Sequence, residues 1–382
     1  MPTRLHYMDN LRALAMLVGV FFHAALAYSP FMKELWIAAD DESLRSLDVV
    51  AWFTHLFRMP LFFLVSGFFA HLLVERKGLR GFLKNRWLRV VLPFVLFLPP
   101  ILLMMMGVVW YGTRFLDLDT VLVRFITGTL QDWPNGKGKF TTSHLWFLYC
   151  LFWFALATGV AVKWSPIRVR AVGFFASPWF VLLILPLILV PALATQMVPH
   201  PAAEDVFLGY WAFGFFGVFF FCGWLFWDRF DSWLAIVERF WPLMLVITLV
   251  SYGYYYSCIP QQMPLSEVFI LFEQPRAMSF DRLPAALSGA FVSVYATFLS
   301  LFAAQKYLRK ESRVMRFIAD SSYWVYIVHL PILLFIQIHL IRLTMPAALK
   351  YIVVVAATFL VGMLSYQWCV RGRALGRLLN GH

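Results

Sequence analysis

The chain has 382 residues, 62% of them hydrophobic and 14% charged, with a mean hydropathy of +0.74. No soluble domain of this length needs so much apolar surface, so the composition predicts a polytopic membrane protein. The net charge of +12 does not indicate nucleic-acid binding, because the basic residues interrupt apolar runs and form no long tract. The four cysteines are scattered without a CxxC pair, and we assign them no chemistry.

Apolar segments long enough to cross a bilayer recur along the whole chain. There are ten of them, at residues 11–30, 49–74, 88–112, 144–162, 177–196, 206–227, 240–257, 285–304, 320–342 and 349–370. No internal repeat or linker divides them. We therefore expect an all-α polytopic integral membrane protein, with residues 1–382 forming a single bundle of about ten transmembrane helices. The first segment imitates a secretory signal, but Asp9 and His23 fit that poorly, so we expect a retained helix.

The basic residues of the connections alternate between the two sides of the bundle. Segments 75–87, 305–319 and the tail after 370 are rich in Lys and Arg, whereas segment 197–205 has neither and segment 31–48 is mainly acidic. The positive-inside rule then predicts that both termini are cytoplasmic. Segment 228–239 is weakly charged and does not indicate on which side of the membrane it lies. The long outer segment 113–143 is expected to hold a short interfacial helix near Leu116–Leu130 and a lid.

Arg12 and His23 both lie in the first apolar segment, where an ionisable side chain is costly. They are eleven positions apart, which on a helix puts them on one face and about 16 Å apart along the axis. Asp9 can pair with Arg12 across one turn. A neutral imidazole is the usual general base at neutral pH, so His23 is the candidate catalytic residue. The alternative without a catalytic role is that the Arg12 side chain extends to the membrane surface (snorkelling) and that His23 is hydrogen-bonded to a neighbouring helix.

Further polar side chains mark both sides of the bundle. Lys84, Arg86 and Arg89 form the strongest anion site, suited to phosphate, unless they serve only to set the topology. His55 and Arg58 share a helix face on the outer side, where a buried cation favours a carboxylate or sugar partner. The alternative for Arg58 is that its side chain only extends outward to the membrane surface and binds no partner.

Two more histidines, His144 and His329, are expected on the outer halves of their helices, with Tyr326 close to His329 in the sequence. Zinc is the obvious competitor for a set of four histidines. No HExxH motif occurs, and no acidic ligand is evident in the outer halves of the segments. We therefore expect no metal site.

Four motifs in order resemble the membrane-bound acyltransferase 3 family over essentially the whole chain. They are Asp9-Asn10-Leu11-Arg12 with His23, Phe62-Phe63-Leu64-Val65-Ser66-Gly67-Phe68, Arg86-Trp87-Leu88-Arg89-Val90-Val91-Leu92-Pro93 and Ser321-Ser322-Tyr323-Trp324-Val325-Tyr326-Ile327-Val328-His329-Leu330-Pro331. Within the family, His55-Leu56-Phe57-Arg58-Met59 and Ser143-His144-Leu145-Trp146-Phe147-Leu148 resemble the glucans biosynthesis protein C branch. Tyr149-Cys150-Leu151-Phe152 departs from the Glu-Glu-Gln-Phe pattern usual in the O-antigen acetylase branch.

The resemblance implies a multi-pass enzyme of the bacterial inner membrane that moves a succinyl group from cytoplasmic succinyl-CoA to hydroxyls of osmoregulated periplasmic glucans. No tightly bound cofactor is implied, since acyl-CoA is a substrate. His23 would act as general base or accept the acyl group itself. The CoA phosphates would be held by Arg12, supported by Asp9, and by Lys84, Arg86 and Arg89. The substrate-binding residues would be His55, Arg58, Ser66, His144, Trp146, Tyr326 and His329, with Arg58 holding the succinyl carboxylate or the glucan.

Two alternatives stay open at this point. An O-acetyltransferase of another cell-surface polysaccharide would keep the same enzyme and change the acyl group. A polysaccharide exporter or secondary transporter is a rival of another class, although the paired Gly/Pro-interrupted segments typical of transporters do not occur in the sequence. A homo-oligomer is compatible with either.

Overall fold

The computed structural model describes residues 6–129, 141–164, 172–175, 177–262, 278–310 and 312–380, and every regular element among them is helical. The expected all-α membrane fold is thereby confirmed. The principal helices are α1 (His6–Ala25), α2 (Arg45–Arg86), α3 (Leu92–Phe115), α5 (Trp146–Trp164), α7 (Leu185–Ala194), α9 (Val218–Ser257), α11 (Leu283–Tyr307), α12 (Arg313–Leu340) and α13 (Ala347–Ser365).

Shorter elements join or extend these helices. They are α4 (Val121–Thr127), α6 (Val172–Phe175), α8 (Tyr210–Ala212) and α14 (Ala374–Asn380), the 3₁₀ turns η1 (Leu26–Tyr28), η3 (Ser143–Leu145) and η6 (Phe280–Arg282), and the π-helical turns η2 (Trp87–Val91), η4 (Phe180–Ile184), η5 (Phe213–Gly217) and η7 (Tyr366–Val370). Helix α4 is the short helix expected within the outer segment 113–143. Residues 130–140 of that segment, including the expected lid, lie outside the described residues.

Eight stretches of the described chain are long and apolar enough to cross a membrane. One of them, Arg45–Phe115, contains both α2 and α3, and the apolar helical stretch Phe180–Ala194 is shorter than the others. All ten expected segments are thus represented by helix. Three expected connections differ, because 75–87, 228–239 and most of 305–319 are themselves helical. Lys, Arg and Glu are good helix formers, so α2 and α9 continue through these charged segments. They bend at Gly78, where φ is +66°, and at Arg229.

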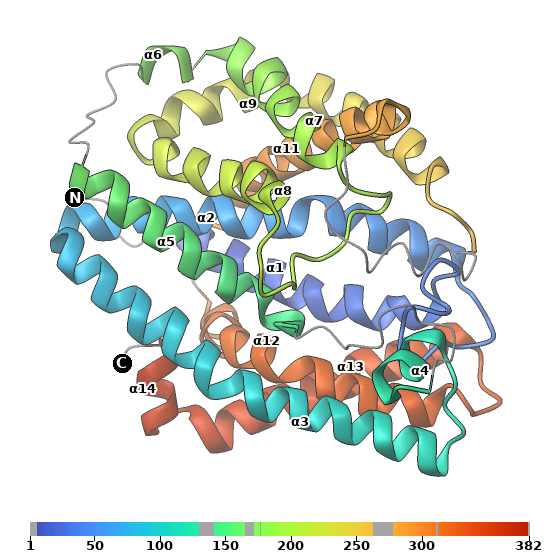
Figure 1. Cartoon of the computed structure of the whole chain (residues 1–382). Coiled ribbons are helices and arrows are strands. Elements are labelled where there is room, and N and C mark those ends of the chain that lie inside the picture. The colour runs from blue at the N-terminus through green and yellow to red at the C-terminus, as the bar shows by residue number, and fades with distance from the viewer. Residues whose placement is uncertain are drawn as a thin grey trace.

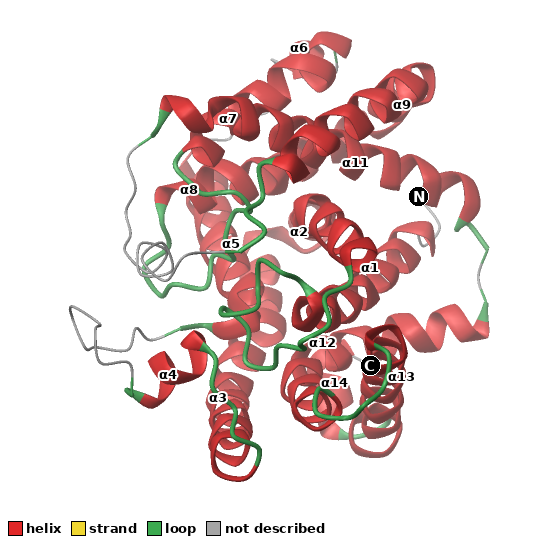
Figure 2. Cartoon of the chain, turned by 90° about the vertical axis from the view of Figure 1, so that its right-hand side faces the viewer, coloured by secondary structure: helices red, strands yellow, loops and turns green. Residues whose placement is uncertain are grey.

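The helices run alongside one another, and both ends of the described chain lie at the same end of the bundle (Figure 1). Viewed from the opposite end, α1 and α2 occupy the centre, with α7, α9 and α11 on one side and α3, α12, α13 and α14 on the other (Figure 2). Helix α1 packs chiefly against α12 and α2. A polar residue on α1 therefore faces protein on two sides.

An aromatic core joins α2, α5, α9 and α11, with Phe63, Phe154 and Phe298 fully buried. Glycines allow α2 and α9 to approach closely. A Cβ on Gly67 would lie 1.8 Å from the Phe220 carbonyl oxygen, and a Cβ on Gly223 would lie 1.8 Å from that of Leu64. Small residues at helix crossings are typical of membrane bundles, so the Ser66-Gly67 motif has a packing explanation at Gly67.

Candidate functional site

Helix α1 carries Arg12 near one end of the bundle and His23 near the other, as the continuous helix His6–Ala25 requires. The Arg12 side chain is 45% exposed and lies 3.8 Å from the Asp9 carboxylate, so the expected pair on α1 is present. Arg86 and Arg89 lie at the same end, and the charges of Arg12 and Arg89 both act on the guanidinium of Arg86. We call these three arginines the basic cluster.

The Arg86 Nε atom is buried and hydrogen-bonds to nothing in the described chain, and its guanidinium lies over the Phe82 ring at 5.3 Å. Arg89 is exposed. Three like charges are held close together here without carboxylates that balance all of them, because Arg12–Asp9 is the one ion pair that the basic cluster makes among the described residues. Such an arrangement is suited to a polyanion.

His23 forms a direct hydrogen bond to His329 of α12, with 2.9 Å between His23 Nδ1 and His329 Nε2. The other nitrogen of His329, Nδ1, lies 2.7 Å from the Tyr326 carbonyl oxygen. A carbonyl only accepts, so neutral His329 carries its proton on Nδ1 and its Nε2 accepts the proton of His23 Nδ1–H. This tautomer leaves the lone pair of His23 on Nε2. His23 therefore presents a basic nitrogen whose orientation is fixed by the partner ring.

Pro331 explains how His144 joins this pair. A proline inside a helix lacks the N–H that would bond to the carbonyl four residues earlier, here that of Ile327. His144 Nε2–H donates to this free Ile327 carbonyl at 3.0 Å. The Tyr326 hydroxyl in turn donates to the His144 carbonyl at 2.8 Å. The start of α5 is thus fixed to α12, and the His144 and His329 rings lie 5.1 Å apart.

His23 also contacts Trp36, whose indole is stacked parallel to the imidazole with 6.1 Å between ring centroids. The indole N–H donates to the Gln337 side-chain oxygen at 3.0 Å, and the Gln337 amide donates to the Ala24 carbonyl at 3.0 Å. Gln337 is fully buried, so this bridge is shielded from water. His23 is consequently held by contacts with His329 and Trp36, inside the bundle rather than against lipid.

The segment that carries Trp36 is anchored by a buried ion pair. Lys350 Nζ of α13 lies 2.7 Å from the Asp40 carboxylate, and the two side chains are only 5% and 2% exposed. Breaking a buried pair leaves an uncompensated charge, which typically costs about 3–5 kcal/mol. The position of Trp36 over His23 is therefore fixed by the fold of this segment.

Arg58 of α2 is buried in the protein interior, with 6% of its surface exposed. Its Nε and Nη1 atoms hydrogen-bond to nothing in the described part of the chain. The guanidinium lies over the Phe22 ring at 4.7 Å, and its charge acts on His23 and on Tyr326. A Cβ on Gly19 would lie 3.2 Å from Arg58 Nη1, so the glycine on α1 gives the side chain its space. A buried, unpaired cation beside a basic imidazole is the most unusual feature of the molecule.

His55 stacks on Phe22 with 5.2 Å between ring centroids, and its ring lies at a tilt against His200 with 4.5 Å between centroids. His55 Nε2–H donates to the His200 carbonyl at 2.9 Å. The remaining nitrogens, His55 Nδ1 and His200 Nε2, have no hydrogen-bond partner among the described residues. His200 precedes α8, in the connection after α7.

A series of rings on α12 links the basic cluster to the histidines. Tyr323, Tyr326 and His329 follow at three-residue spacing, with the two tyrosine rings stacked at 6.5 Å and Tyr326 6.2 Å from His329. The Tyr323 hydroxyl donates to the Arg89 carbonyl at 2.8 Å. One face of α12 therefore extends from the basic cluster to His23.

The structure brings together most of the residues singled out from the sequence. His23, Arg58, His144, Tyr326 and His329 form one interior site, and His55 joins it through Phe22. Arg12, Arg86 and Arg89 meet at the other end, supported by Asp9.

Three of the predicted site residues lie neither in the interior site around His23 nor in the basic cluster. Lys84 is exposed and is not among the charges that act on Arg86, and Trp146 packs in the aromatic core against Phe216 at 5.0 Å. Ser66 is half-buried two turns from Arg58. Their roles stay predictions.

Sequence reasoning missed Trp36, Gln337 and His200. Gln337 had a detectable signal, since it is a polar residue eight positions after His329 in an apolar helix. Trp36 and His200 lie in connections without periodicity, so only the tertiary structure reveals them. Within the described ranges, no group of three His, Cys, Asp or Glu side chains is arranged to hold a metal ion.

Comparison with known proteins agrees with this geometry. A family model described as an acyltransferase domain matches residues 5–367. The glucans biosynthesis protein C of Escherichia coli strain K12, strain SMS-3-5 / SECEC and strain O1:K1 / APEC is in each case 31% identical over 156 residues, which is 39% of this chain and 36% of the relative. The match thus spans about a third of the length of these relatives. No solved structure matches the chain. With nearly its whole length covered by that model, the chain belongs to the acyltransferase 3 family of membrane acyltransferases.

Proposed function

We propose that this membrane acyltransferase moves a succinyl group from succinyl-CoA in the cytoplasm to a hydroxyl of a periplasmic glucan. The similarity to glucans biosynthesis protein C supports a glucan acceptor. The basic cluster lies at the same end of the bundle as both ends of the described chain, which the positive-inside rule assigns to the cytoplasm of a bacterial inner membrane. His23 and the histidines around it then belong to the outer half.

The buried guanidinium of Arg58 is the observation that carries the proposal. Burying an unpaired charge is costly unless a partner arrives, and an Arg fork matches a carboxylate in geometry. Arg58 offers two unpartnered nitrogens beside His23. A succinyl group ends in a carboxylate and an acetyl group does not. The free carboxylate of a succinyl thioester would neutralise Arg58 while its thioester carbon lies next to the imidazole.

The donor would enter from the basic cluster. CoA carries several phosphates, which Arg12, Arg86 and Arg89 can bind by charge-assisted hydrogen bonds. The rise of α1 between Arg12 and His23 is about 16 Å, a distance that the extended pantetheine arm must cover. The half-buried rings of Tyr323 and Tyr326 follow the same direction on α12.

The reaction is a transfer of the acyl group to a sugar oxygen. His23 Nε2 takes the proton of the hydroxyl as its oxygen attacks the thioester carbonyl carbon, and a C–O bond forms. The C–S bond then breaks, and the CoA thiolate takes the proton back from His23 Nε2–H, which yields the ester and free CoA. His329 is a positioning residue, because its Nε2 accepts the His23 Nδ1 proton and stabilises the imidazolium that forms between the two steps.

Reconstitution in liposomes tests the proposal. Radiolabelled succinyl-CoA is supplied on one side and a soluble glucan on the other, with orientation determined by protease access to an added terminal tag. We expect labelled glucan only when the donor meets the side of the basic cluster. His23→Ala in the same liposomes is the matched control, and inserted protein is quantified in both.

Three results would overturn all or part of the proposal. Label on the glucan only when donor and acceptor share one side would remove the transmembrane arrangement. Movement of unmodified glucan across the membrane without acylation would support the exporter alternative. Labelling of the glucan by acetyl-CoA but not by succinyl-CoA would mean that the donor is acetyl-CoA, while the protein would still be an acyltransferase.

A further inference from the structure

The connection between α1 and α2 folds back over the end of α1 that carries His23. His23 lies in the last turn of α1, and the connection lies at the end of the bundle remote from the N-terminus (Figure 1). The Asp40 N–H donates to the Ala27 carbonyl of η1 at 2.8 Å, so the chain returns across the turn that follows α1. In this way the indole of Trp36 comes to lie against the imidazole of His23.

Trp36 is held in place by its surroundings. The indole packs against four hydrophobic clusters, which gather side chains from α1, α3, α12 and α13 among others. On the side of α4, the Glu34 carboxylate accepts from the Val121 N–H at 3.2 Å. On the side of α13, the Glu42 carboxylate accepts from the Ala347 N–H at 2.9 Å. The connection is thus anchored on both sides, and Trp36 belongs to a fixed cover over the end of α1.

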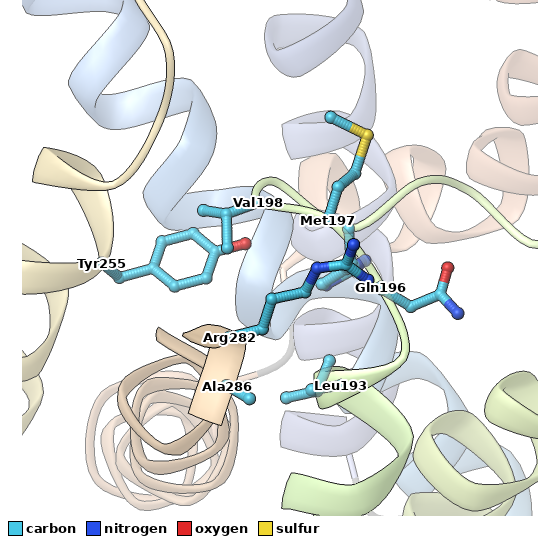
Figure 3. A pocket seen from close by; sticks show the side chains of 8 residues that line it. Leu193, Gln196, Met197, Val198, Tyr255, Arg282 and Ala286 are labelled. Carbon is cyan, nitrogen blue, oxygen red and sulfur yellow. The ribbon is translucent and has the colours of Figure 1, made fainter. Parts of the chain in front are cut away.

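The second histidine pair, His55 and His200, is covered differently. A small pocket, partly open to solvent, lies beside His200 where the end of α7, the end of α9 and the start of α11 meet, and Tyr255 and Arg282 line it (Figure 3). It has room for about one water-sized group. The packing therefore leaves a gap the size of a water molecule at the second pair, whereas an aromatic ring lies against His23 at the first.

The access of water to His23 matters because a general base can activate water as well as a sugar hydroxyl. With water as the nucleophile, His23 Nε2 takes one proton while the water oxygen bonds to the thioester carbonyl carbon. The C–S bond then breaks, and the CoA thiolate takes the proton from His23 Nε2–H. The products are CoA and succinic acid, which ionises, so the thioester is consumed without acylating a sugar. Closing an active site against water prevents such hydrolysis.

We propose that Trp36 is a specificity-determining residue, which keeps water from His23 and so directs the acyl group to the sugar hydroxyl. The inference rests on the proposed function for the acyl-CoA donor. Gln337 is the positioning residue for the indole, because its side-chain oxygen accepts from the Trp36 N–H at 3.0 Å. The amide of Gln337 is itself fixed, since it donates to the Ala24 carbonyl at 3.0 Å. His23 is half-buried, so the indole covers part of the imidazole and leaves surface for the reactants.

The purified full-length protein in nanodiscs tests the inference, first without any acceptor. Succinyl-CoA and, separately, acetyl-CoA are supplied, and free CoA is measured by its thiol. We expect Trp36→Leu to hydrolyse the thioester about tenfold faster than the unmodified protein, because water then reaches His23. Trp36→Phe keeps a ring and loses the N–H to Gln337, so we expect an increase of a few-fold. When a soluble glucan is added, the ratio of free CoA to labelled glucan should rise in the same order.

Trp211→Leu is the matched control. Trp211 is also a buried tryptophan at the end of the bundle that holds the histidines, but it contacts His200, with 6.1 Å between ring centroids, instead of His23. The hydrolysis rate of this variant should equal that of the unmodified protein. When His23→Ala is combined with Trp36→Leu, the gained hydrolysis should disappear, because His23 Nε2 activates the water.

Each outcome bears on the role of Trp36. Unchanged hydrolysis in Trp36→Leu and Trp36→Phe, with transfer to the glucan intact, would overturn the inference and leave the proposed function untouched. An equal increase in Trp211→Leu would mean a general loosening of the bundle, and this also would overturn it. So would gained hydrolysis that persists without His23.

Two further points keep the test decisive. Consumption of neither thioester by any of these proteins, with or without glucan, would overturn the proposed donor and the inference with it. If Trp36→Leu does not fold, Trp36→Phe and Gln337→Leu replace it, since each removes the hydrogen bond of the indole and keeps an aromatic ring beside His23.

Discussion

Two buried histidine pairs lie in the outer half of the proposed topology, and they are built differently. In the first pair, His23 donates directly to His329, which donates in turn to a carbonyl of its own helix. In the second pair, the rings of His55 and His200 pack at a tilt, and each ring donates to a backbone carbonyl, that of His200 and that of Pro201, instead of to the other ring. Phe22 and Arg58 lie between the two pairs.

The difference decides which chemistry each pair can perform. Direct bonding couples the two rings, so charge that develops on His23 is stabilised by His329. The tilted packing of the second pair leaves two lone pairs, on His55 Nδ1 and His200 Nε2, that no described residue uses and that can each accept a hydrogen bond. Two histidines in contact therefore do not define a function until the destination of each N–H is known.

Replacing His23 should have the largest effect. His23→Ala removes the general base, whose contribution is typically 10²–10⁴-fold, and the transfer rate from a saturating donor should fall by that amount. His200→Ala, in the other pair, should lower the maximal rate less than tenfold, because His200 reaches Arg58 only through the rings of His55 and Phe22. Both variants are assayed at equal amounts of folded, inserted protein. Equal losses in maximal rate would remove the distinction between the pairs.

Arg58→Leu should affect the two possible donors unequally. A hydrogen bond to a charged group contributes about 1.5–3 kcal/mol, which corresponds to roughly 10–150-fold in kcat/KM for succinyl-CoA. The loss for acetyl-CoA should be less than fivefold, because an acetyl group has no carboxylate. Competition between the two labelled donors in one reaction gives the ratio directly. A ratio identical to that of the unmodified protein would contradict the assignment of Arg58 to the succinyl carboxylate.

His329→Leu should reduce kcat about tenfold, because a neutral hydrogen bond contributes roughly 0.5–1.5 kcal/mol and the imidazolium of His23 loses its acceptor. His329→Gln should recover part of this loss, since its amide oxygen can accept from His23 Nδ1–H. A merely structural residue would change protein yield without shifting the pH profile of kcat. We expect the pH profile of kcat in His329→Leu to differ from that in His329→Gln, because only the glutamine keeps an acceptor for His23 Nδ1–H. Identical pH profiles of kcat in the two variants would mean that His329 contributes only to packing.

Much of this arrangement follows from the sequence. Helical spacing places Arg12 and His23 on one helix, and alternation of basic segments separates the basic cluster from the histidines. The tautomers of the histidines cannot be predicted from the sequence. They depend on a carbonyl freed by Pro331 and on contacts between α1 and α12. His200 could not be found, since a residue between prolines in a connection has no periodicity. In the Ser66-Gly67 motif, by contrast, a family pattern visible in the sequence has a structural role at Gly67, where it allows α2 and α9 to pack closely.

The smallest expected effect is on stability and comes from the second pair. The folded pKa of His200 is about 4, below the ordinary value of 6.5, so the unfolded chain binds more protons between these values and stability falls as the pH falls. Between pH 6.5 and 5.5 this contribution should decrease by about 1 kcal/mol, on the order of two degrees in the unfolding midpoint.

His200→Gln provides the matched comparison, because it removes the imidazole and keeps a polar side chain in the same place. His55, Tyr255 and Arg282 face His200 and remain in both proteins, so their own contributions cancel in the difference. Thermal unfolding in nanodiscs at pH 6.5 and 5.5 should show the extra decrease in the unmodified protein alone. An equal decrease in both proteins would mean that His200 is already solvated, and its Nε2 would then not be the buried, unpartnered acceptor that distinguishes this pair from His23 and His329.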